Sequence, residues 1–110
     1  MRTDLRRWLG RVGVPGGVAE DIVLAAWELC ANAIEHPAQP DPSEVTLDAE
    51  AYTHGVRVTV HDAGVWNGHR LTRAKRGLGL RIVEGLVDRL AVRRGFEGTE
   101  VMLFRCTRLT

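Results

Sequence analysis

The sequence predicts an α+β fold, a two-layer α/β sandwich whose helices cover one face of a mixed, mainly antiparallel sheet. Three observations predict it. Apolar residues recur at helical spacing at the start of the chain and again after residue 77. Alternating apolar and polar residues predict strands, and short turns join these strands into hairpins. The length of 110 residues fits one domain over residues 1–110.

Two helices are expected before the first strand. The first covers residues 5–9, where Leu5, Trp8 and Leu9 share one apolar face. The second runs from about Val18 to His36 and ends there because a proline follows. Its apolar face is predicted to hold Ile22, Ala25, Ala26, Leu29 and Ala33.

A hairpin is expected after the second helix. Apolar residues occupy every second position from Val45 to Ala51, and again from Val56 to Val60. A Thr-His-Gly turn separates the two runs. The alternation predicts strands with one face buried and the other exposed to solvent.

A third helix and a second hairpin are expected to complete the chain. The helix begins at Gly77 and carries four apolar residues at helical spacing, which are Leu80, Val83, Val87 and Leu90. Strands then follow near Arg89–Arg94 and Thr99–Cys106, joined by a glycine-containing turn. The predicted order is α-α-β-β-α-β-β.

Composition excludes several classes of protein. Hydrophobic residues make up 45% of the chain and charged residues 26%, and the formal charge of +1 does not favour a nucleic-acid binder. No apolar run reaches the roughly 18 residues of a membrane helix. The charged N-terminus does not resemble a signal peptide, so we expect a cytoplasmic protein. Cys30 and Cys106 are far apart in sequence and are expected to be thiols in or near the core, not zinc ligands.

Polar residues form a stripe along the second predicted helix. Glu28, Asn32 and His36 are spaced four apart, which places them close together on one side of the helix. The Asn32 carbonyl oxygen suits Mg²⁺, the Glu28 carboxylate could take a proton from an attacking hydroxyl, and His36 could donate to a phosphate. The alternative is that the stripe is the solvated side of an amphipathic helix.

Two strand positions carry inward-facing polar groups. Asp62 shares the parity of the buried valines before it, and a buried carboxylate needs a donor such as the exocyclic amine of adenine. Gly64 would allow a flat ring to approach the backbone. Thr99 shares the inward parity of Val101 and could assist Asp62. A turn-capping aspartate and an ordinary strand threonine are the alternatives.

A glycine-containing turn opens the third predicted helix. Helix N-termini bind phosphate readily, and glycines leave the amides unobstructed. The preceding loop adds the cations Arg73, Lys75 and Arg76, which could close over a triphosphate. The pattern fits neither a P-loop nor a dinucleotide-binding turn. The candidate phosphate-binding residues are Arg76, Gly77, Leu78, Gly79 and Leu80.

In this order, the four motifs resemble those of the GHKL (Bergerat-fold) ATPases, and specifically the branch of anti-sigma-factor serine/threonine kinases. The resemblance runs from about Leu5 to Arg105, and the chain begins near the first helix, where many relatives carry an earlier strand. The loop between Gly64 and Gly77 is short, and a short loop over the nucleotide is typical of this branch.

The resemblance implies a role for each candidate residue. Glu28 would be the catalytic base and Asn32 the Mg²⁺ ligand, with His36 at the basic end of the helix motif. Asp62 and Thr99 would bind adenine beside Gly64. The turn from Gly77 to Leu80 would hold the phosphates.

The resemblance also implies cofactors and partners. We expect ATP and Mg²⁺, transfer of the γ-phosphate to a serine of an anti-anti-sigma protein of the STAS type, binding of a sigma factor, and a homodimer. No direct contact with nucleic acid or membrane is expected. Two alternatives stay open, a partner-binding module without catalysis and an ATPase or signalling domain of another GHKL branch.

Overall fold

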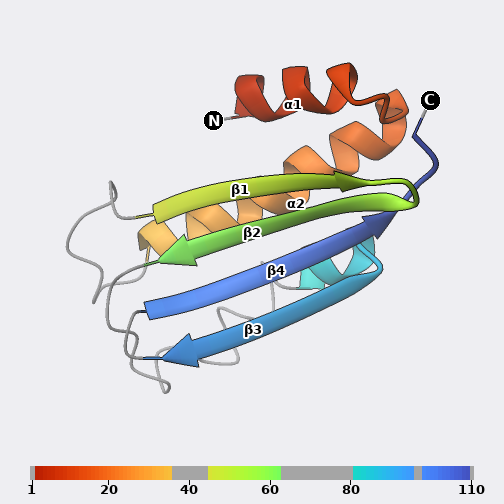
Figure 1. Cartoon of the computed structure of the whole chain (residues 1–110). Helices are drawn as coiled ribbons and strands as arrows, with labels where there is room; N and C mark the ends of the chain where they lie inside the picture. The colour runs from red at the N-terminus through yellow and green to blue at the C-terminus, as the bar shows by residue number, and fades with distance from the viewer. Residues whose placement is uncertain (1, 36–44, 63–80, 96–97, 110) are drawn as a thin grey trace.

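The computed structural model is a two-layer sandwich with helices over one face of a four-stranded sheet (Figure 1). It describes residues 2–35, 45–62, 81–95 and 98–109. The elements are α1 (Arg2–Arg11), α2 (Gly16–Glu35), β1 (Val45–Tyr52), β2 (Gly55–Asp62), a helical segment over 81–86, β3 (Arg89–Gly95) and β4 (Gly98–Cys106). The predicted α+β class and order of elements are confirmed.

The sheet is built from two hairpins joined at its centre. The strand order is β1-β2-β4-β3, and each of the three neighbouring pairs is antiparallel. β2 and β4, which are distant in sequence, therefore lie side by side in the middle of the sheet (Figure 1). The carboxyl end of β2 lies beside the amino end of β4.

A glycine ends α1 and turns the chain into α2. Gly13 has a φ of 91°, a left-handed conformation that glycine adopts without steric penalty. The amide of Gly13 donates to the Gly10 carbonyl at 3.2 Å, and the amide of Val14 donates to the Leu9 carbonyl at 3.0 Å. This bonding is that of a Schellman cap. Leu9 and Val14 are both buried, which supplies the hydrophobic contact that accompanies such caps.

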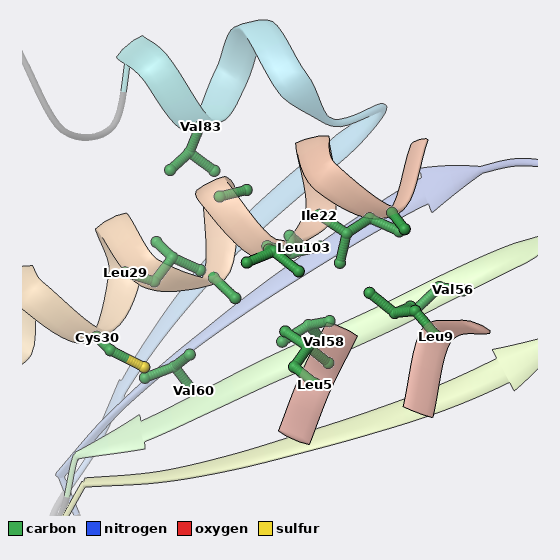
Figure 2. Packing of buried hydrophobic residues seen from close by; sticks show 14 of the residues in the cluster. Leu5, Leu9, Ile22, Leu29, Cys30, Val56, Val58, Val60, Val83 and Leu103 are labelled. Carbon is green, nitrogen blue, oxygen red and sulfur yellow. The ribbon is translucent and has the colours of Figure 1, made fainter. Parts of the chain in front are cut away.

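The hydrophobic core lies between the helices and the sheet (Figure 2). Side chains from both layers are fully buried in it, and these include Leu9, Ile22, Val56, Val58, Val83 and Leu103. The valines of β2 are the inward-facing set that alternation predicts. Val83 points from the segment 81–86 toward α2, so this segment packs beside α2 on the same face of the sheet (Figure 2).

The third helix ends earlier than its apolar spacing predicts. The helical segment ends at residue 86, so Val87 lies beyond it and Leu90 belongs to β3. Tertiary bonds at Asp88 explain this difference. Its amide donates to the Phe104 carbonyl at 2.8 Å, and its carboxylate accepts from the Cys106 amide at 2.6 Å. These bonds fix the chain to β4 before another helical turn can form.

The other face of the sheet carries charged residues together with the larger side chains of Tyr52, Met102 and Phe104. Cross-strand ion pairs join Glu50 to Arg57, and Arg93 to Glu100 at 2.9 Å. Within the described ranges, none of the helices is long and apolar enough to cross a membrane. Both cysteines are free thiols, as expected, and Cys30 is buried in the core. Cys106 is exposed, contrary to the expectation, because its parity on β4 places it on the face of the sheet away from the helices.

Candidate functional site

Asp62 and Thr99 form a buried polar pair at one end of the sheet. They are register partners on β2 and β4, and each residue is 2% exposed. Their burial follows from the parity that they share with the core valines and with Leu103. The pairing of β2 with β4 thus brings Asp62 and Thr99 side by side, although the two residues are far apart in sequence.

The Thr99 hydroxyl has no hydrogen-bond partner in the described parts of the chain. Its Oγ1 atom is buried and has no hydrogen bond to any of the residues that the structure describes. An unsatisfied buried hydroxyl costs about 1–3 kcal/mol, and most buried polar atoms are paired. A ligand that exchanges hydrogen bonds at this end of the sheet would remove that cost, so the pair fits a binding site for a polar ring.

The side of α2 that carries Asp21 faces the segment 81–86. Asp21 lies on this face and accepts a hydrogen bond at 2.8 Å from Arg105, which also donates to the carbonyl of Leu86 at 2.7 Å. Glu28 follows Asp21 by seven residues, which leaves the two about 20° apart around the helix axis. Glu28, which is half-buried, therefore lies on the side of α2 that borders this segment.

The same stretch of α2 lies over the end of β2 that carries Asp62. Cys30 contacts the core beside Val60, two residues before Asp62 (Figure 2). Position 32 falls within α2. Helical spacing places it, like Glu28, within about 20° of Asp21. The structure thus brings the backbone of the predicted helix motif to the end of the sheet where Asp62 and Thr99 lie.

Other candidate residues lie outside the described parts of the chain. These are His36, Gly64, Arg76, Gly77, Leu78, Gly79 and Leu80. The side chain of Asn32 is also outside the described parts, although its backbone is described. The described chain resumes at Arg81, directly after the predicted phosphate-binding turn. The helical segment that this turn precedes does pack against α2, as Val83 shows.

Sequence reasoning missed the contact between Asp21 and Arg105. Two signals were present. Asp21 shares a helix face with Glu28, and Arg105 shares the inward parity of Thr99 and Leu103. An arginine at the end of an inward-facing row needs an acceptor, because buried charge is costly when unpaired.

Fold and site together define a two-layer α/β sandwich with a buried polar pair at one end of the sheet and an acidic helix face beside it. Comparison with known proteins gives the family. The histidine kinase-like ATPase domain matches residues 1–105, and the chain belongs to this family. Membership implies nucleotide binding.

One solved structure gives a closer comparison. The structure of the RsbU and RsbW domains of Rv1364c from Mycobacterium tuberculosis matches 99% of this chain, with a TM-score of 0.75 and 30% sequence identity. This chain spans 30% of the length of that one. The family match confirms the predicted GHKL family, and the structural match supports the predicted anti-sigma-factor kinase branch.

Proposed function

We propose that this domain binds ATP with Mg²⁺ and transfers the γ-phosphate to a serine of a STAS-type anti-anti-sigma protein. The observation that carries the proposal is the buried pair of Asp62 and Thr99, whose hydroxyl has no partner among the described residues. The family membership of residues 1–105 supports a nucleotide as the missing partner.

Adenine recognition is assigned to the sheet end. The Asp62 carboxylate accepts a hydrogen bond from the exocyclic amine of adenine, and Thr99 assists through its hydroxyl. Gly64 leaves space beside the ring. Guanine presents a carbonyl oxygen where adenine presents the amine, and a carboxylate repels it. The site should therefore select ATP over GTP, because guanine presents an acceptor oxygen at the position where the carboxylate favours a donor.

Phosphoryl transfer is assigned to α2 and the turn before residue 81. The Glu28 carboxylate takes the proton of the target serine hydroxyl while that oxygen forms a bond to the γ-phosphorus. The bond from the γ-phosphorus to the β,γ-bridging oxygen breaks, and ADP leaves. The amides of Gly77–Leu80, with His36 and Arg76, offset the phosphate charge. Positioning and electrostatic stabilisation supply most of the catalysis in such transfers.

Mg²⁺ fits the donors available. Within the described ranges there is no group of three or more His, Cys, Asp or Glu side chains that could hold a metal ion. That suits an ion which takes most of its ligands from phosphate oxygens and water. Asn32 would hold it with a neutral carbonyl oxygen, and the ion would neutralise charge on the phosphates.

The proposed partners follow from the branch of the family. The domain would bind a sigma factor as a homodimer and release it when the STAS protein competes. The similar structure carries RsbU and RsbW domains in one chain, which supports a place in a regulatory cascade.

Radiolabelled transfer tests this function. Purified protein is incubated with γ-labelled ATP, Mg²⁺ and each STAS protein of the source organism, and the acceptor residue is identified by mass spectrometry. We expect phosphoserine on one STAS protein. Glu28→Gln should slow the transfer by about 100-fold or more, the contribution typical of a general base, while ATP affinity stays the same.

The other outcomes of this experiment separate the alternatives. Bound ATP without any phosphorylated partner would identify a partner-binding module. Release of inorganic phosphate without a phosphorylated protein would indicate an ATPase of another GHKL branch.

A further inference from the structure

A single arginine joins three elements of the fold. The Nη1 atom of Arg105, on β4, donates to the Oδ2 atom of Asp21 at 2.8 Å and to the carbonyl oxygen of Leu86 at 2.7 Å. Asp21 lies on α2, and Leu86 is the last residue of the helical segment 81–86. One guanidinium therefore connects both helical elements to the sheet.

The environment of Arg105 strengthens these bonds. Its side chain is 23% exposed, so water screens the pair less than it would screen a surface ion pair. A bond between guanidinium and carboxylate is stronger than a neutral hydrogen bond. A cation at a helix C-terminus also satisfies a carbonyl that has no helical partner and interacts favourably with the helix dipole.

Asp88 secures the chain directly after the same helix end. Its amide and carboxylate bond to the backbone of β4 at Phe104 and Cys106, on either side of Arg105 in sequence. The carboxyl end of the segment 81–86 is thus fixed to β4 by the backbone. Among the hydrogen bonds between described residues, only those of Arg105 also connect this end of the segment 81–86 to α2.

We propose that Arg105 is a positioning residue that sets the alignment of the segment 81–86 against the Glu28 face of α2. Asp21 and Glu28 share this face, so a shift at Asp21 moves the carboxylate assigned to catalysis relative to the helix that follows the phosphate-binding turn. The inference rests on the proposed ATP binding. Arg105 lies six residues along β4 from Thr99, so it would act on the phosphate groups through the segment 81–86 and not on the adenine end at Asp62 and Thr99.

Comparison of two ligands tests this role. Affinities for ATP with Mg²⁺ and for adenosine are measured by titration of the whole domain, in wild type, Arg105→Met, Arg105→Lys and Asp21→Asn. Arg6→Met is the matched control, because the pair of Arg6 and Glu20 also joins two elements, α1 and α2, at 2.7 Å. Circular dichroism confirms that each variant is folded.

A selective loss is expected. Arg105→Met should weaken ATP binding by about 10-fold, the scale of one lost hydrogen bond to a charged group, and should leave adenosine affinity within about twofold. Asp21→Asn should weaken ATP binding in the same direction. Arg105→Lys should restore most of the ATP affinity, because an ammonium can donate to both acceptors. Arg6→Met should leave both affinities at the wild-type value.

Two results would overturn the assignment. One is equal loss of ATP and adenosine affinity in Arg105→Met, which would indicate general loosening of the fold. The other is unchanged ATP affinity in both Arg105→Met and Asp21→Asn, with wild type still binding. Failure of the wild type to bind ATP would instead contradict the proposed function itself, and the positioning role with it.

Discussion

Asp62 and Thr99 are register partners on the two central strands, and both side chains are buried on the helix-covered face of the sheet. Neither residue is near the other in sequence. The pairing of β2 with β4 alone brings them together. A buried carboxylate lies beside a buried hydroxyl that has no hydrogen bond to any described residue, and this distinguishes this end of the sheet from an ordinary core.

Thr99→Val separates a binding role from a structural one. Valine matches threonine in shape and removes the hydroxyl that has no partner among the described residues. We expect the ligand-free protein to keep its melting temperature or to gain stability, because an unsatisfied buried group costs about 1–3 kcal/mol. ATP affinity should fall. Calorimetric scans with and without ATP measure both effects. A variant that is less stable than wild type without ligand, but binds ATP with full affinity, would indicate that the hydroxyl has a purely structural role.

Asn32→Ala should remove the magnesium dependence of nucleotide binding. In wild type, ATP at about 100 times its dissociation constant should stabilise the fold by about 2.7 kcal/mol when Mg²⁺ is present. With ATP and Mg²⁺ present, the variant should show only the smaller rise in melting temperature that wild type shows when EDTA removes Mg²⁺, because the variant lacks the assigned metal ligand. A thermal shift series with ATP, with and without Mg²⁺, checks this. The same magnesium-dependent gain in both proteins would refute the role of Asn32.

Stability should fall at alkaline pH because of Cys30. Burial raises the pKa of this thiol, so the folded state favours the protonated form. The unfolded chain loses this proton first, near pH 8.5. The stabilising contribution is therefore complete below that pH and is lost as pH rises toward the folded pKa. Urea unfolding from pH 7 to pH 10 should show a steeper decline in wild type than in Cys30→Ala, and parallel declines would contradict this assignment.

Local patterns in the sequence predict most of the fold. Alternation from Val56 to Val60 predicts both the strand and the inward direction of Asp62, because side chains of a strand alternate between faces. The glycine-rich break after Leu9 predicts a turn between the two helices, and Gly13 forms its left-handed cap.

Contacts between distant segments could not be predicted. The end of the third helix depends on Asp88, whose bonds to β4 form only in the folded chain. The resemblance implies that Asp62 and Thr99 act together, but local patterns do not give the order of strands that makes them register partners. The inward parity of Arg105 predicts that it needs an acceptor, but periodicity does not identify Asp21 as that acceptor.

Nucleobase preference is the most direct test of the central claim, that Asp62 reads adenine at the end of the sheet. Titration calorimetry with ATP and with GTP, each with Mg²⁺, is compared in wild type and Asp62→Asn. We expect wild type to bind ATP much more tightly than GTP, and Asp62→Asn to lose about 10-fold or more in ATP affinity, the scale of a hydrogen bond to a charged group. A wild type that binds neither nucleotide, or a variant that keeps the full preference for ATP, would contradict the account.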